Sequence, residues 1–343
     1  MKGMQAMKHG NSLRRLVKRK KGISISALKV NRLALIYASA VFALVLAYWF
    51  IPINRGSEFS AGEEQSALPV EELEPLIAPF YPTFENAAIL TTMEEKTKYI
   101  YTIDETAYVY EDELDIQSYL QADLSTPLTG PEPKILIFHT HSREAFIDSR
   151  PGEDDDTVIG VGSTLADILS RDYHVPVVHD VGRYDVVNGR EMRDGSYERM
   201  NPAVKNILDK YPSIEVTIDV HRDGVPDGVR LVREVNGLPT ARMMFFNGIT
   251  RLNDNGRPKS MPELVNPYIK ENLALSLQLQ LTANEFYPGL MRNVYIKPYR
   301  YSLALKPKSI LVEVGANTST VREAKNAMAP LAEILMSVLQ EKD

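Results

Sequence analysis

The sequence contains no cysteine among its 343 residues, only one tryptophan and only six histidines. Without cysteine the protein cannot form disulfides, bind a metal through thiolates or use a cysteine nucleophile. Neither a Gly-rich phosphate loop nor a G-x-S-x-G motif occurs, which argues against a P-loop nucleotide site and a serine-hydrolase elbow. A metal site in this chain would therefore use histidine and carboxylate side chains.

Acidic residues are absent from the first 32 positions, which carry ten lysines and arginines. The rest of the chain holds the other 29 basic residues and all 45 acidic ones, so it is strongly acidic. This asymmetry argues against a uniformly basic nucleic-acid-binding protein, and we expect no nucleic-acid partner. The hydrophobic fraction of 44% and the charged fraction of 24% are ordinary for a globular protein.

A run of 21 uncharged residues, 33–53, follows the basic residues 1–32, which we expect to form a cytoplasmic tail. About 20 apolar residues in a helix span the hydrocarbon core of a bilayer, and the preceding positive charges predict a cytoplasmic N-terminus. A buried core helix and a cleavable signal peptide are the alternatives. The run is apolar all round and its A-x-A-like triplet, Ala38-Ser39-Ala40, lies mid-span, so we predict an uncleaved transmembrane signal anchor.

The composition changes again after the predicted span. Residues 54–130 carry Gly, Ser and Pro early and then many acids, which predicts an extracytoplasmic stalk or N-terminal region. From residue 131 to 343, short β-branched or aromatic runs alternate with amphipathic stretches. We expect strands at 134–138, 175–179, 214–220, 242–246, 293–297 and 309–314, and helices at 157–171, 202–210, 269–286 and 320–341. This alternation predicts an α/β domain with a mostly parallel sheet of about six strands and helices on both faces.

Histidines and carboxylates lie at or just after the ends of three of these strands. Open α/β sheets carry their ligand-binding and catalytic sites at this edge, the carboxyl ends of the strands. His139, His141 and Glu144 come after the first strand, His221 comes after the third, and Glu313 lies on the last. Two histidines and one glutamate, with an open position for water, are a usual composition of a catalytic zinc site. The sequence therefore predicts a Zn²⁺ site, with His139 and His141 as alternatives for its first ligand.

Glu313 lies in an apolar strand, where a carboxylate is costly unless it is paired or functional. A carboxylate beside a metal can take a proton from water and pass it to a leaving amine, and we assign Glu313 this catalytic role. Asp219 and Asp223 flank His221 and could orient its ring. Three further residues near the strand ends are candidates for contacts with substrate or with the ligands: Arg143, Arg222 and Asn317.

Seven segments follow one another along the chain in this order: ILIFHTHSREAF (135–146), VGSTLADIL (161–169), HDVGRYD (179–185), GSYERM (195–200), IDVHRDG (218–224), NPYIKENL (266–273) and ILVEVGANTST (310–320). Over about residues 131–340 this pattern resembles the stage II sporulation protein P family, membrane-anchored peptidoglycan hydrolases of endospore-forming bacteria. The HTHxxE and DxHRD motifs, followed by a terminal VEVGxN, carry most of the resemblance.

The resemblance implies the fold of an N-acetylmuramoyl-L-alanine amidase, a zinc-dependent hydrolase that cuts the amide between the lactyl group of the glycan and L-alanine. The family is also credited with endopeptidase activity. The later zinc-binding histidine of related amidases corresponds to His221 and their catalytic glutamate to Glu313. Their strand-plus-DPGH pattern favours His141 over His139 as the early ligand, and Glu144 substitutes for a ligand that they carry further downstream.

The resemblance also implies a peptidoglycan substrate, and a lytic transglycosylase and a membrane scaffold as partners in engulfment. We expect a single-pass membrane protein whose catalytic domain lies outside the cytoplasm, in the septal space around the forespore. One alternative is a degenerate, catalytically inactive module that binds peptidoglycan and recruits partners, and another is a metal-dependent esterase or phosphoesterase. The presence of both metal histidines and of Glu313 favours the enzyme, and the small number of candidate ligands argues against a two-metal phosphatase.

Overall fold

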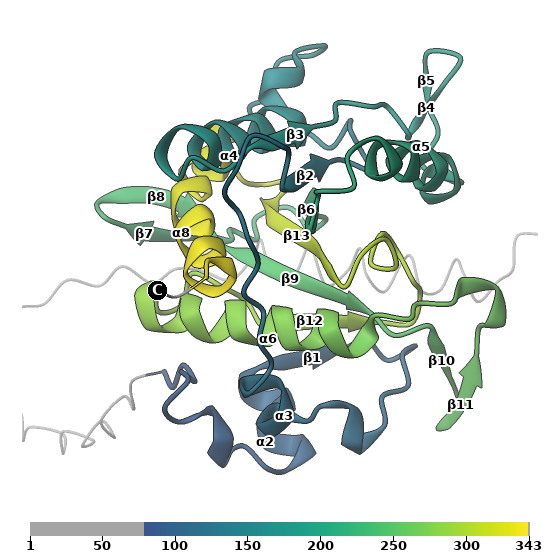
Figure 1. Ribbon diagram of the computed structural model, residues 1–343, viewed down its shortest axis with the longest axis vertical. Coiled ribbons are helices and arrows are strands. Elements are labelled where there is room, and N and C mark those ends of the chain that lie inside the picture. Colours follow the sequence, from purple (N-terminus) through teal and green to yellow (C-terminus); the bar gives the residue numbers. More distant parts are fainter. Residues whose placement is uncertain (1–78, 342–343) are drawn as a thin grey trace, which may run out of the picture. The chain divides into compact units, whose positions relative to one another are not determined.

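The computed structural model describes residues 79–341 (Figure 1). The basic tail, the predicted membrane span at 33–53 and the first part of the predicted stalk lie outside the described residues. Within residues 79–341, no helix combines the length and the apolar character that crossing a bilayer requires.

Seven strands form the central sheet, in the order β1–β12–β9–β13–β6–β2–β3. Their bounds are β1 Tyr101–Ile103, β2 Ile135–Phe138, β3 Val177–His179, β6 Val216–Asp223, β9 Met243–Gly248, β12 Val294–Lys297 and β13 Lys308–Ala316. All neighbouring strands are parallel except β13 and β9, which are antiparallel. The predicted α/β class with a mostly parallel sheet is confirmed, with β1 as one strand more than expected.

Helices cover both faces of this sheet. Their bounds are α2 Met93–Tyr99, α3 Ile116–Leu120, α4 Val158–Asp172, α5 Ser196–Lys210, α6 Ile269–Phe286, α7 Val321–Asn326 and α8 Met328–Leu339, with short 3-10 helices η1 Ala87–Ile89, η2 Glu111–Glu113, η3 Asp154–Asp156 and η4 Pro262–Leu264. Ile135 and Ile137 of β2 belong to the core that includes buried residues of α4, α6 and α8. Leu136 and Phe138 point to the other face and pack with Met200 of α5.

Two helices differ from the sequence-based expectation. The predicted helix at 320–341 is two helices, α7 and α8, joined at Ala327. Pro330, in the first turn of α8, has no N–H to donate, and its ring would clash with the carbonyl of Asn326 in a continuous helix. Helix α5 begins at Ser196, earlier than expected, and Pro202 lies inside it. Its buried Met200 lies on the N-terminal side of the proline, so packing extends the helix in that direction.

Three hairpins outside the central sheet have turns with the same sequence and the same backbone conformation. They are β4 Val186–Val187 with β5 Arg190–Glu191, β7 Val232–Val235 with β8 Leu238–Ala241, and β10 Arg251–Asp254 with β11 Arg257–Ser260. Each turn is an Asn-Gly pair in which both residues have positive φ, at positions 188–189, 236–237 and 255–256. Two-residue turns of this kind match the twist of the flanking strands, and Asn-Gly tolerates the left-handed backbone they need.

Residues 79–130, assigned from sequence to the stalk or N-terminal region, pack on the α/β body. Strand β1 pairs in parallel with β12 at the edge of the sheet. Leu114 and Ile116 are buried in the same core as the helices. The described part of this segment therefore belongs to one structural unit with residues 131–341, since its apolar residues have no separate core of their own.

Gln278 of α6 connects this segment to the body. Its side-chain amide donates to the carbonyl oxygens of Tyr119 (2.7 Å) and Ala122 (2.8 Å) at the end of α3. Gln278 is buried, so its removal leaves two carbonyl groups without their partner.

We predict that Gln278→Ala lowers the free energy of unfolding by about 1–3 kcal/mol, because buried carbonyl groups lose their donor. Denaturant unfolding of the purified protein measures the change. Gln121→Ala is the matched control, because Gln121 is exposed at the end of α3, and we expect it to change stability by less than about 0.5 kcal/mol. Equal stability of the two variants would contradict this role of Gln278.

Candidate metal centre

The candidate site lies where β2 and β6 end side by side. The two strands are parallel, and Phe138, the last residue of β2, is in register with Asp219 of β6. The loop that leaves β2 carries His139, His141 and Glu144, and β6 continues to His221. Segments about 80 residues apart in sequence therefore meet because the parallel register brings the two strand ends together.

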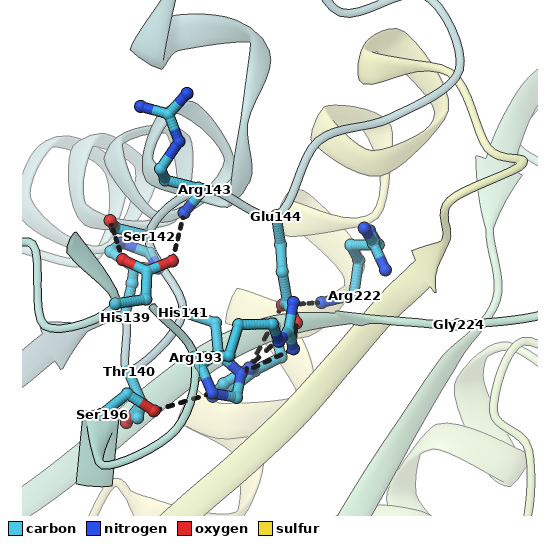
Figure 2. Close-up of polar contacts among 12 residues, drawn as sticks. His139, Thr140, His141, Ser142, Arg143, Glu144, Arg193, Ser196, Arg222 and Gly224 are labelled. Carbon is cyan, nitrogen blue, oxygen red and sulfur yellow. Dashed lines mark hydrogen bonds and ion pairs between the residues drawn. The ribbon is translucent and has the colours of Figure 1, made fainter. Parts of the chain in front are cut away.

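Three predicted ligands converge at this edge (Figure 2). His141, Glu144 and His221 each offer a donor atom, and these atoms lie within 4.8 Å of one another. His141 Nδ1 lies 3.5 Å from Glu144 Oε1, and His221 Nδ1 lies 3.2 Å from Glu144 Oε2. Two imidazole nitrogens and one carboxylate in this arrangement are a donor set that could hold a transition-metal ion.

His139, the alternative to His141, does not join the cluster. Its Nδ1 lies 3.0 Å from the carbonyl oxygen of Val220, and its Nε2 lies 2.9 Å from Nε2 of His179. A Cβ added at Gly162 of α4 would lie 2.6 Å from this ring, so His139 is packed tightly against the helix. Burial lowers the pKa of His139 to about 3, which keeps the ring neutral. Of the two alternatives, His141 is therefore the one that lies with Glu144 and His221 in this structure.

Asp219 lies beside His221 on the side away from Glu144, within ion-pair distance but outside hydrogen-bond geometry. Its Oδ1 lies 2.9 Å from His221 Nε2 and accepts a 2.9 Å hydrogen bond from the backbone N–H of Thr140. Its Oδ2 accepts from the Thr140 hydroxyl at 2.6 Å. A carboxylate beside one ring nitrogen leaves the other nitrogen, Nδ1, directed at Glu144, where a metal could take the place of its proton.

Charges of both signs are packed closely in this site. Burial would lower the pKa of His221, but the carboxylates of Asp219 and Glu144 raise it well above its usual value. Burial would likewise raise the pKa of Glu144, but His221 and His141 hold it well below the usual value. Glu144 is therefore ionised near neutral pH, as a metal ligand must be.

Glu313 lies next to the cluster on β13. It is in register with His221 on the neighbouring strand β6. Its carboxyl Oε2 is shielded from solvent and has no hydrogen-bond partner among residues 79–341. Burial, opposed by the charge of His221 and reinforced by Glu144, raises the pKa of Glu313 to about 8. This carboxyl group can therefore exchange a proton near neutral pH.

Two residues of the site were missed by the sequence analysis. Nη2 of Arg193 donates to Glu144 Oε1 at 2.7 Å and to His141 Nδ1 at 2.9 Å. Ser196 Oγ lies 2.9 Å from His141 Nε2 and orients the ring from its other side. Both come from the segment that leads into α5, about 50 residues from the HTHxxE motif, and no spacing in the sequence connects them to it.

Arg143 lies between two of the candidate ligands in sequence but points away from them (Figure 2). Its backbone N–H donates to Asp185 Oδ2 at 2.9 Å, and the neighbouring Ser142 hydroxyl donates to Asp185 Oδ1 at 2.5 Å. The Arg143 side chain lines a cavity of about 290 Å³ and has no ion-pair partner within the described chain. Arg150 and Arg183, which also line the cavity, pair with Asp156 and Asp154.

The remaining predicted residues brace the loops around the site. The Arg222 backbone N–H donates to Glu144 Oε2 (3.0 Å), and its guanidinium donates to the carbonyl oxygen of Ala145 (2.9 Å). Asp223, predicted as a possible partner of His221, pairs instead with Arg292 at 2.6 Å. Two further bonds join Asn317 to the end of β6: its backbone N–H donates to the carbonyl of Asp223, and its side chain accepts from the N–H of Val225.

Comparison with known protein families identifies one match over most of the chain. The sequence model of the family described as stage II sporulation protein P matches residues 78–336. Stage II sporulation protein P of Bacillus subtilis (strain 168) is 23% identical over 228 residues, which are 62% of this chain. The matched region is 53% of that relative, so the chain spans about half of its length.

Solved structures with some likeness include bacterial N-acetylmuramoyl-L-alanine amidases. The apo form of Ami1 from Mycobacterium abscessus has a TM-score of 0.37 at 10% identity, with 61% of this chain and 99% of that chain covered. The CwlD amidase from Clostridioides difficile, solved in complex with the GerS lipoprotein, has a TM-score of 0.35 at 12% identity, with 60% and 94% covered.

We predict that Asp219→Asn weakens Zn²⁺ binding by about 10- to 100-fold, because His221 loses the carboxylate that orients its ring. Competition with a colorimetric chelator measures the dissociation constant. Asp223→Asn is the matched control, since Asp223 pairs with Arg292, and we expect its zinc affinity to stay near that of the unmodified protein. Equal zinc affinity of the two variants would show that Asp219 does not support the ligand.

Proposed function

This chain belongs to the stage II sporulation protein P family, and from that premise we propose that it is a zinc-dependent peptidoglycan hydrolase. Its reaction is the N-acetylmuramoyl-L-alanine amidase reaction, with cleavage of peptide cross-links as an additional activity. The observation that carries the proposal is the convergence of His141, Glu144 and His221 beside the carboxyl group of Glu313.

The donor set of this site suits zinc. His141 Nδ1, His221 Nδ1 and the Glu144 carboxylate are the proposed ligands, and Asp219 supplies the carboxylate–histidine pairing that such sites use. A zinc ion bound there supplies Lewis-acid chemistry, polarising the scissile carbonyl and making the attacking water more acidic.

Glu313 is the proposed general base and general acid. Its carboxylate takes a proton from the attacking water and then donates it to the nitrogen of the departing amine, which must be protonated to leave. Burial raises the pKa of Glu313, and the positive charge of a zinc ion bound nearby would lower it, toward the range in which the carboxylate can accept a proton from water and then release it. The position of Glu313, in register with His221, supports this role.

Arg143 is the proposed contact for a carboxylate of the stem peptide. The bonds to Asp185 fix the backbone of the Arg143 loop. Arg143 lines a cavity to which none of the three proposed metal ligands contributes, and its guanidinium could bind a carboxylate there in a bidentate manner. Arg222 has the bracing role described above, and its backbone N–H also holds Glu144 in place.

We also propose that the protein acts at the septal membrane during engulfment. The uncharged run at 33–53 would anchor it with a cytoplasmic N-terminus and place the hydrolase outside the cytoplasm. A lytic transglycosylase is a suitable partner, because glycan strands freed of peptide can then be cut along the sugar chain. A membrane scaffold would hold the two enzymes together at the septum.

We predict that Glu313→Gln lowers amide hydrolysis by about 10²- to 10⁴-fold while zinc content stays unchanged, because the variant cannot transfer the proton. Isolated wall sacculi serve as substrate, and mass spectrometry detects peptide-free glycan strands. The control is Glu263→Gln, an exposed substitution in η4, with activity expected near that of the unmodified protein.

Two outcomes would count against this proposal. Full activity of Glu313→Gln would remove Glu313 from the mechanism. If the unmodified, zinc-loaded protein binds sacculi and releases no product, it is instead a recruitment module without catalysis.

We predict that Arg143→Ala raises KM for stem peptides with free carboxylates by about 10-fold or more and changes kcat little, since a charge-assisted contact to substrate is lost. Steady-state kinetics on soluble wall fragments test this, with Arg143→Lys expected to recover part of the loss. Substrates with amidated carboxylates provide the comparison. An equal rise in KM for free and amidated substrates would argue against carboxylate recognition by Arg143.

A further inference from the structure

Arg193 contacts two of the proposed metal ligands with a single nitrogen atom. Its Nη2 lies 2.7 Å from Glu144 Oε1 and 2.9 Å from His141 Nδ1 (Figure 2). A guanidinium group has only donors, so both of these atoms act as acceptors toward it. The two atoms belong to the proposed metal-binding cluster, and they lie 3.5 Å apart.

Nδ1 of His141 can accept a hydrogen bond from Arg193 or coordinate a metal, but it cannot do both at once. An imidazole nitrogen has one lone pair in the ring plane, which can accept a hydrogen bond or coordinate a metal. Zinc binds histidine nitrogen and carboxylate oxygen at about 2.0–2.2 Å, so a bound ion would lie against the same two atoms. The positive charges of the ion and of the guanidinium would also repel each other at this distance.

The surroundings of Arg193 allow its side chain to leave without refolding of the backbone. The N–H of Met192 donates to the carbonyl of Asp185 (2.7 Å), and the N–H of Ser196 donates to the carbonyl of Arg193 (3.0 Å). These bonds hold the main chain on both sides of the residue. The side chain itself is 45% exposed, whereas that of Glu144 is 3% exposed. Rotation of the Arg193 side chain alone can therefore move the guanidinium into solvent.

We propose that Arg193 competes with the metal ion for His141 Nδ1 and Glu144 Oε1 and so sets the metal affinity of the site. This inference rests on the proposed function, in which these two residues are ligands. Arg193 pairs with the buried Glu144 carboxylate and donates to the two donor atoms that a metal would bind. When a metal ion binds, it replaces the Arg193 guanidinium at these two atoms. The loss of the Arg193 hydrogen bonds opposes metal binding and so lowers the affinity.

The test is a zinc titration of the full-length protein in detergent, against a colorimetric chelator of known affinity. We expect Arg193→Ala to bind zinc about tenfold or more tightly than the unmodified protein, because the metal no longer has to displace hydrogen bonds to charged groups. Arg193→Lys keeps the charge and loses the planar fork, and we expect an intermediate affinity. Circular dichroism checks that each variant is folded.

Arg190→Ala is the matched control, because Arg190 is exposed in the neighbouring strand β5 and the same charge is removed. At about 0.15 M salt we expect its zinc affinity to stay within about twofold of the unmodified protein, because exposed charges are screened.

An affinity of Arg193→Ala equal to or weaker than that of Arg190→Ala would overturn the competition, while zinc binding by the unmodified protein would leave the proposed function intact. Zinc binding by neither the unmodified protein nor Arg193→Ala would overturn both.

Discussion

The buried carboxylate of Asp219 connects the two chain segments on which the candidate metal centre depends. It accepts the backbone N–H and the hydroxyl of Thr140, which lies between the two histidines after β2, and it contacts the ring of His221 after β6. A fully buried carboxylate is stable when its oxygens are satisfied in this way. One side chain thus contacts both the start of the HTHxxE loop and His221, which lie about 80 residues apart in the sequence.

The same site gathers more negative charge than an apolar sheet edge tolerates without compensation. The carboxyl groups of Asp219, Glu144 and Glu313 lie near one another, and in the described structure His221 and Arg193 supply the opposing charge. Burial is the main cause of the raised pKa of Glu313; the charge of His221 opposes it and the negative charge of Glu144 adds to it. A divalent cation would be stabilised by the negative charge of these carboxyl groups. The Arg193 guanidinium is stabilised by the same charge, which is the basis of the proposed competition.

Much of the candidate site could be predicted because its residues belong to short motifs at strand ends. Glu144 follows His141 by three residues in a turn, whose closure is seen in the bond from the N–H of Glu144 to the carbonyl of His141 (3.2 Å). Glu313 could be singled out because it is a carboxylate in an apolar strand. The resemblance already favoured His141 over His139, although both lie in one loop, and in the structure the contacts of His139 with α4, Val220 and His179 place it outside the cluster. Ser196 belongs to the GSYERM segment and Arg193 lies just before it, but nothing local connects either residue to the cluster, because that relation exists only after α5 has packed on the sheet.

Local composition was sufficient for the alternation of strands and helices, and hence for the α/β class and the edge of the sheet at which chemistry should lie. Hydrophobic periodicity and secondary-structure propensity are set by residues close together in the sequence, so they can be recognised from one sequence alone. Strand order, the antiparallel pairing of β13 with β9, the inclusion of β1 in the sheet and the arginine on the ligand atoms were decided by the tertiary structure. These features depend on contacts between residues tens to nearly two hundred positions apart, and their energies come from burial and charge pairing that no local window contains.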